Sequence, residues 1–183
     1  MIILASKSPR RKELLGMCEF EFEIKTTEAD ETLPEGISPA DAVCMLSKIK
    51  AEALGDSENI VIGADTVVAI DNEILGKPEN REDAFLMLKK LSGRTHSVYT
   101  GVTILKGKKT KTFCEETKVE FYDLSDDEIK KYVETGDCDD KAGSYGIQGL
   151  GGLLVRGICG DYNNVVGLPV AKLSRELKEF IQN

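Results

Sequence analysis

Hydrophobic and polar residues follow two different periods along this chain, and together they predict strands that interleave with helices. Ile2–Ala5 and Asn59–Ala64 are apolar runs typical of buried strands, and residues 20–25 alternate as a half-buried strand does. Further strands are predicted at 66–71, 95–105, 111–122 and 153–158, and helices at 9–15, 39–54, 80–92, 125–133 and 169–181. The segment 66–71 either extends the preceding strand or follows a bend.

Local signals mark where several helices begin. Ser8-Pro9 and Ser38-Pro39 each place a serine N-cap before a proline at the first helical position. Residues Ser125–Glu128 have the pattern of a capping box. The strands 95–105 and 111–122 are joined by a short turn, which favours an antiparallel pair. We therefore expect an α/β fold with a mixed twisted sheet and flanking helices, formed by a single domain over residues 1–183.

Composition and charge exclude several classes of protein. The chain has 183 residues and a formal net charge of −8, which argues against non-specific binding to nucleic acid or to a membrane surface. No apolar run in the sequence approaches the length of a membrane span. The five cysteines form no CxxC pair, so we expect no zinc site, no disulfide framework and a cytoplasmic location. An acidic protein that binds an anion must gather positive charge locally or recruit a metal.

The segment Ser6–Arg11 joins a predicted strand to a predicted helix and is the first of four with candidate chemistry. Arg10 and Arg11 lie in the first helical turn, where cations oppose the helix dipole, yet the same dipole and the free N–H groups favour an anion. Arg11 also shares a helical stripe with Leu14 and Leu15, which places its guanidinium at the edge of the packed face. A bound phosphate accounts for this pattern better than a pair of surface arginines does.

Two further segments place charge within hydrophobic sequence. Lys50 lies on the apolar stripe of the predicted helix 39–54, where a lysine usually extends its ammonium group to solvent unless a phosphate pocket is near. Asp65 follows a buried strand, and a carboxylate there needs a cation or a metal as its partner. Lys77, in the loop Gly76–Pro78, is either a phosphate contact or part of an ordinary turn.

The fourth segment, Asp140–Gly149, combines an acid, a lysine, glycines, a tyrosine and a glutamine. Glycines let a backbone approach a ligand closely, although a Gly-rich loop is also compatible with a purely structural role. A second polar loop follows at 160–169. The acidic loop that contains Asp30 and Glu31 offers a second carboxylate to a hard cation such as Mg²⁺, with a solvated loop as the alternative. We interpret His96, the only histidine, as structural.

Taken together, these motifs resemble the Maf family of nucleoside triphosphate pyrophosphatases. The resemblance spans nearly the whole chain and keeps the order of five motifs, which are Ser6–Leu15, Ala64–Val68, Gly76–Pro78, Asp140–Gly149 and Tyr162–Pro169. Each motif alone is modest, whereas all five in register are highly specific. Asp65-Thr66 and 140–149 look like the dTTP/UTP-hydrolysing branch and differ from the branch that acts on methylated guanosine triphosphate.

The resemblance implies hydrolysis of a pyrimidine nucleoside triphosphate to the monophosphate and pyrophosphate, with Mg²⁺ or Mn²⁺ as the divalent metal. It leaves the ranking of dTTP, UTP, CTP and modified pyrimidine triphosphates open. By motif match, Asp65 is the expected general base and, with Glu31, the expected metal ligand. The expected substrate contacts are Ser8, Arg11, Lys50 and Lys77 at the phosphates, and Arg10, Thr66 and Gln148 at the specificity positions. Family members have two lobes around a central cleft and often form homodimers.

The amide of Gln148 agrees with a pyrimidine substrate, because it offers one acceptor and one donor in a plane that complement N3–H and O4 of uracil or thymine. A flipped amide pairs with cytosine as well, so Gln148 alone does not exclude CTP. Two other classes compete with an enzyme. One is a nucleotide-binding regulator without turnover, linked to cell division, but a pure binder has no need for a base such as Asp65. The other is a nucleic-acid-binding module, which the acidic charge disfavours.

Overall fold

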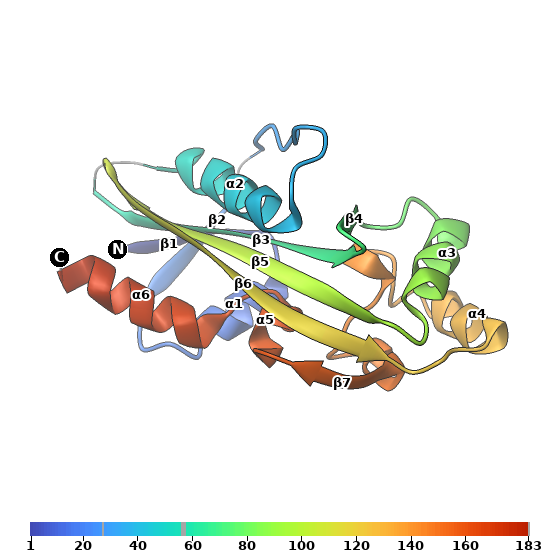
Figure 1. The fold of residues 1–183 in the computed structure, drawn as a ribbon. Coiled ribbons are helices and arrows are strands. Elements are labelled where there is room, and N and C mark those ends of the chain that lie inside the picture. Colours follow the sequence, from blue (N-terminus) through green and yellow to red (C-terminus); the bar gives the residue numbers. More distant parts are fainter. Residues whose placement is uncertain (27, 56–57, 183) are drawn as a thin grey trace.

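The centre of the fold is a mixed sheet of seven strands in the computed structural model, which describes residues 1–26, 28–55 and 58–182 (Figure 1). The strands are β1 (Ile2–Ala5), β2 (Phe22–Lys25), β3 (Ile60–Ile70), β4 (Glu73–Leu75), β5 (Thr95–Lys106), β6 (Lys109–Phe121) and β7 (Val155–Cys159). Their order is β2-β1-β3-β5-β6-β7, with β4 beside β3. β1 pairs parallel with β2 and β3, whereas the remaining pairings are antiparallel.

Six α-helices flank this sheet within the described ranges, as Figure 1 shows. They are α1 (Pro9–Leu15), α2 (Pro39–Glu52), α3 (Arg81–Leu91), α4 (Asp126–Glu134), α5 (Tyr162–Val166) and α6 (Val170–Gln182). The N-caps predicted at Ser8, Ser38 and Ser125 are confirmed, because each side chain accepts a backbone N–H three residues on, and Asn80 caps α3 in the same way. α2 covers one face of the sheet, and α1, α5 and α6 cover the other (Figure 1). None of these helices is both long and apolar enough to span a membrane.

The two largest clusters of buried side chains lie toward opposite ends of the long strands. One packs the sheet against α3 and α4 and includes Val68, Ile70, Val98, Leu88, Leu91, Ile129 and Val133. The other packs it against α1 and α6 and includes Ile62, Ala64, Val102, Leu14, Leu15, Leu173 and Leu177. Asp65 and Thr66 fall between the two sets on β3. The fold therefore has two lobes that share their long strands (Figure 1). Asp65 lies where the lobes meet, because it falls between the two clusters along β3.

β3 continues without a bend from Ile60 to Ile70, which resolves the choice that its sequence left open. Gly63 and Gly101 allow α2 to pack directly on the sheet here, because a Cβ atom at Gly63 would lie 2.1 Å from the carbonyl oxygen of Ser47. Two short elements, β4 and α5, were not predicted. The predicted alternation at 20–25 is confirmed for Phe20 and Phe22, which are partly buried against the core, but Ile24 is 40% exposed and β2 begins only at Phe22.

Candidate active site

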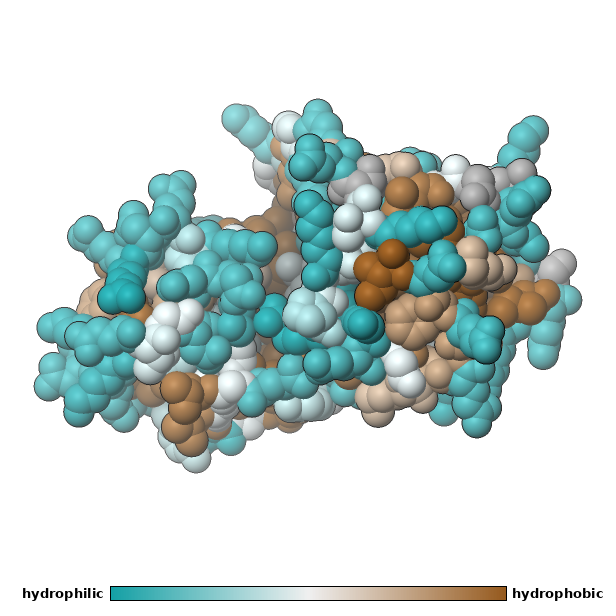
Figure 2. Space-filling model, turned by 180° about the vertical axis from the view of Figure 1, so that it is seen from behind, coloured by the Kyte–Doolittle hydropathy of each residue, from teal (hydrophilic) through white to brown (hydrophobic). Residues whose placement is uncertain are grey.

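A cleft of about 920 Å³ opens between the two lobes, and the space-filling view shows the surface hollowed near the middle of the molecule (Figure 2). Its walls come from the start of α1, the middle of β3, the acidic loop before α2 and the Gly-rich segment after α4. All the predicted site residues line it, namely Ser8, Arg10, Arg11, Glu31, Lys50, Asp65, Thr66, Lys77 and Gln148. The fold thus brings together side chains that are up to 140 positions apart in the sequence.

Lys50 links the two carboxylates that the sequence offered as metal ligands. Its Nζ donates a hydrogen bond of 2.5 Å to Oδ1 of Asp65 and lies 3.4 Å from Oε2 of Glu31. The side chains of Asp65 and Lys50 are only 15% and 19% exposed, so their charges are little screened by solvent. One ammonium group reaches both carboxylates, so the side chains of Asp65 and Glu31 lie close together. The negative charge of the two carboxylates favours a cation between them.

This donor set suits a hard divalent cation that also contacts a phosphate. No group of three or more His, Cys, Asp or Glu side chains in the described residues is placed to hold a metal by itself. Mg²⁺, however, is commonly bound by one or two carboxylates together with substrate phosphates and water. The pair Asp65 and Glu31 fits that arrangement, in which the substrate completes the coordination.

The guanidinium of Arg11 is engaged by the protein itself. Nε donates to the carbonyl oxygen of Gly167 at 2.8 Å, and Nη2 donates to Oγ1 of Thr66 at 2.9 Å. Nη1 donates to the carbonyl oxygen of Ala64 at 2.9 Å and to Oγ of Ser6 at 3.4 Å. Burial lowers the pKa of Arg11, and the charge of Asp65 opposes that shift. The sequence predicted that Arg11 lies at the edge of the packed face, but not that it binds these four acceptors.

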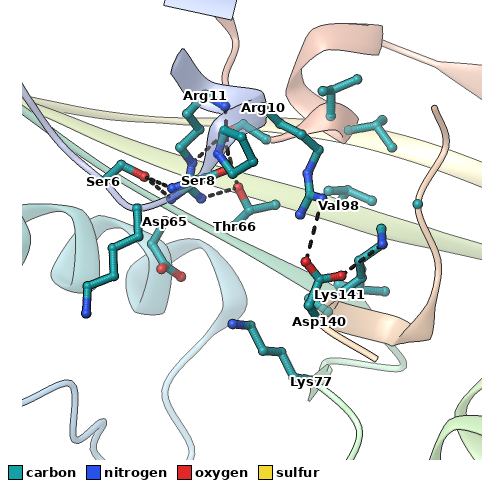
Figure 3. Close-up of a pocket in the computed structure, with 18 of the residues that line it drawn as sticks. Ser6, Ser8, Arg10, Arg11, Asp65, Thr66, Lys77, Val98, Asp140 and Lys141 are labelled. Carbon is teal, nitrogen blue, oxygen red and sulfur yellow. Dashed lines mark hydrogen bonds and ion pairs between the residues drawn. The ribbon is translucent and has the colours of Figure 1, made fainter. Parts of the chain in front are cut away.

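Arg10, by contrast, points across the cleft toward the Gly-rich segment (Figure 3). Its Nη1 lies 3.9 Å from Oδ2 of Asp140, whose other oxygen accepts a hydrogen bond of 2.9 Å from Nζ of Lys141. The hydrogen bond from Lys141, with the charge of Arg10, holds the pKa of Asp140 below its ordinary value. Lys77 extends its ammonium group toward the space between Asp65 and Asp140 (Figure 3). Two cations from opposite lobes therefore face the same cavity.

A partly buried ion pair supports the loop that carries Gln148. Nζ of Lys141 donates to the carbonyl oxygen of Asp137 at 2.5 Å and lies 3.2 Å from its Oδ1, and the hydroxyl of Tyr132 donates to Oδ2. The stem of Lys141 covers Gly146, where a Cβ atom would lie 2.6 Å from Cε. Asp137 was not among the predicted site residues. Residues 135–140 form turns and not a helix, so the spacing of Asp137 and Lys141 gave no signal of this ion pair.

Comparison with known proteins decides the family. A family model described as "Maf-like protein" matches residues 1–180. The chain belongs to the Maf family. The dTTP/UTP pyrophosphatase of Bacillus cereus (strain G9842) is 53% identical over 181 residues, covering 98% of this chain and 95% of the relative. The dTTP/UTP pyrophosphatase of Bacillus mycoides (strain KBAB4) has the same identity and coverage.

Solved structures place this Maf protein within a wider fold group. The Ham1 protein of Staphylococcus aureus has a TM-score of 0.56 at 16% identity, over 97% of this chain and 98% of that protein. A HAM1 protein from Coxiella burnetii has a TM-score of 0.55 at 14% identity with the same coverage. At these identities the likeness concerns the fold alone, and it confirms the predicted mixed sheet with flanking helices.

His96 of this Maf protein lies outside the cleft, in keeping with its interpretation as structural. It is 2% exposed, and its Nε2 shares a hydrogen bond of 2.8 Å with the hydroxyl of Tyr145. Burial lowers the pKa of His96 to about 4, so the ring is neutral at pH 7. Because Tyr145 itself lines the cleft, this buried pair fixes the Gly-rich segment to β5 from behind.

Proposed function

We propose that residues 1–183 act as a single domain that hydrolyses dTTP and UTP to the nucleoside monophosphate and pyrophosphate, with a divalent cation. The observation that carries this proposal is the position of Asp65, a carboxylate at the middle of a cleft whose walls present cations from both lobes. The 53% identity to dTTP/UTP pyrophosphatases supports the same activity. A regulator without turnover remains the alternative, but it has no use for this carboxylate.

In the proposed reaction, Asp65 takes a proton from the water that attacks the triphosphate. A carboxylate within hydrogen-bond reach of that water is a suitable general base. Lys50 orients the carboxylate of Asp65, because its ammonium group donates a hydrogen bond to Oδ1. Asp65 and Glu31 would hold the divalent cation, which when bound neutralises charge on the phosphate oxygens. Carboxylate oxygens of this kind suit both Mg²⁺ and Mn²⁺.

The phosphates are assigned to the cations that face the cavity. Lys77 reaches into it from the loop after β4, and Ser8, the N-cap of α1, lines it as well. Fixed positive groups of this kind act most strongly where a transition state concentrates negative charge in a water-poor site. Arg10 and Thr66 are assigned to substrate selection, as the resemblance implied.

Recognition of the nucleobase is assigned to Gln148. Replacing Gln148 with alanine should reduce discrimination between nucleobases more than it reduces the rate of the chemical step. A site built around a paired polar edge rejects analogues that leave its groups unsatisfied, and deleting the amide removes that penalty. We expect the kcat/KM values for UTP and CTP to converge, while the size of the pocket still opposes purines. Gln182→Ala, on the exposed end of α6, is the matched control. A uniform loss on every substrate would show that Gln148 serves the fold or the chemical step instead.

A panel of triphosphates tests the proposed substrate class. The purified protein is assayed with Mg²⁺ and, separately, with Mn²⁺ against the common ribo- and deoxyribonucleoside triphosphates. We expect the highest kcat/KM for dTTP and UTP, and much lower values for purine triphosphates. Preference for a purine triphosphate would contradict the assignment of Gln148 and the branch of the family.

A homodimer and a cytoplasmic location belong to the same proposal. Cysteines 18, 44, 114, 138 and 159 are all free thiols, which supports a reducing compartment. The oligomeric state is checked by light scattering on the purified chain, for which a mass near 20.1 kDa would indicate a monomer.

A further inference from the structure

The sheet has a gap beside Asp65. β1 pairs with β3 only as far as Ala5 opposite Gly63, and β4 pairs with β3 only from Leu75 opposite Val68. Between these points, residues 64–67 of β3 have a strand neighbour on the side of β5 alone. A carbonyl group that faces such a gap needs another donor, because an unpaired buried backbone group is costly.

Arg11 supplies hydrogen-bond donors in this gap. Its Nη1 donates to the carbonyl oxygen of Ala64, and its Nη2 donates to the hydroxyl of Thr66, which also shares a hydrogen bond of 2.9 Å with Thr100. The guanidinium therefore contacts the residues directly before and after Asp65. Its Nε also donates to the carbonyl oxygen of Gly167, the residue that follows α5.

The direction of the Asp65 side chain depends on this arrangement. Successive residues of a strand point to opposite faces, so Asp65 faces α2 and Lys50 while Ala64 and Thr66 face the other side. Holding the chain at both neighbours fixes the Cα–Cβ bond of Asp65 relative to the cleft. Four of the five N–H bonds of the Arg11 guanidinium are used in these contacts and in the one to Ser6, which leaves a single N–H for any ligand.

We propose that Arg11 is a positioning residue, whose guanidinium takes the place of a missing strand beside β3 and fixes the direction of the Asp65 carboxylate. This inference rests on the proposed role of Asp65 as the general base. It replaces the expectation that Arg11 binds phosphate, and it leaves the phosphates to Lys77, Lys50 and Ser8.

Arg11→Lys separates the two roles, because lysine keeps the positive charge but loses the fork that binds several acceptors at once. We expect kcat for UTP to fall by about 10²-fold, as a small misplacement of a catalytic group does. The dissociation constant of the non-hydrolysable α,β-imido analogue of UTP should change little. Lys77→Met is the matched variant, for which the dissociation constant should rise. The inference is overturned if Arg11→Lys keeps the parent kcat, or weakens analogue binding as much as Lys77→Met does.

A measurement on the unmodified protein guards against a variant that fails to fold. The Nε–H proton of Arg11, observed by NMR on ¹⁵N-labelled protein, should exchange slowly with water before any ligand is added, and pyrophosphate should not alter that rate. Rapid exchange that becomes slow with pyrophosphate would identify a phosphate ligand and overturn the inference. The exchange measurement does not require turnover. The proposed activity fails independently of it, if UTP and dTTP yield no pyrophosphate.

Discussion

Replacing Asp65 with asparagine should lower kcat for dTTP and UTP by about 10²–10⁴-fold, which is the usual contribution of a general base. Asparagine has nearly the same shape but cannot accept a proton from water. Since Asp65 is also an assigned metal ligand, the Mg²⁺ concentration at half-maximal rate should rise in the variant. The contacts of Arg11 to the neighbouring residues are untouched, so the fold should persist.

Asp71→Asn is the matched control for this variant. Asp71 follows the end of β3, pairs with Arg94 and does not line the cleft. Its backbone has a positive φ of 53°, which asparagine tolerates better than most residues. We expect parent rates for Asp71→Asn and unchanged far-ultraviolet circular dichroism for both variants. If Asp65→Asn turned over substrate at nearly the parent rate, Asp65 would not be the general base.

Replacing Lys50 with methionine should lower kcat by about 10²–10³-fold, the cost of removing one fixed group that stabilises developing charge. It also leaves the carboxylates of Asp65 and Glu31 facing one another without the ammonium that now lies between them. A free divalent cation then no longer competes with Lys50 for this point. The Mg²⁺ concentration at half-maximal rate should therefore fall even as kcat falls.

Lys48→Met provides the matched control, because Lys48 lies on the same helix and pairs with Glu52 on its exposed face. We expect parent kinetics for that variant, since exposed ion pairs of this spacing contribute little. Steady-state rates measured over a range of Mg²⁺ concentrations give both kcat and the Mg²⁺ concentration at half-maximal rate. Two results would contradict this role of Lys50. One is a Lys50→Met variant with the parent kcat, and the other is a variant that needs more Mg²⁺ than the parent does.

The helix starts could be predicted from the sequence because their signals are local. Ser8, Ser38 and Ser125 cap helices with side chains that reach only three residues along the chain. β4 and α5, of three and five residues, are too short for a period to show. β3 is paired with β5 continuously over residues 61–69, and because β5 is a separate segment further along the chain, this pairing has no signature in the sequence of β3 itself.

The sequence predicted which residues line the cleft more completely than it predicted the contacts between them. Sequence placed Lys50 on an apolar stripe and Asp65 in apolar surroundings, and each of these positions calls for a partner. That the two residues are partners of one another follows only from the packing of α2 on β3. The acceptors of Arg11 depend on where β1 ends and β4 begins, and one of them, Gly167, is 156 positions away. No local pattern carries that information.

The identity of the products, measured with and without a divalent cation, tests the central claim most directly. UTP and dTTP are incubated with the parent protein, and monophosphate, diphosphate, pyrophosphate and inorganic phosphate are quantified over time in Mg²⁺ and in EDTA. We expect equimolar monophosphate and pyrophosphate in Mg²⁺, and almost no turnover in EDTA. Release of inorganic phosphate with the nucleoside diphosphate, or equal turnover in EDTA, would contradict the proposed reaction.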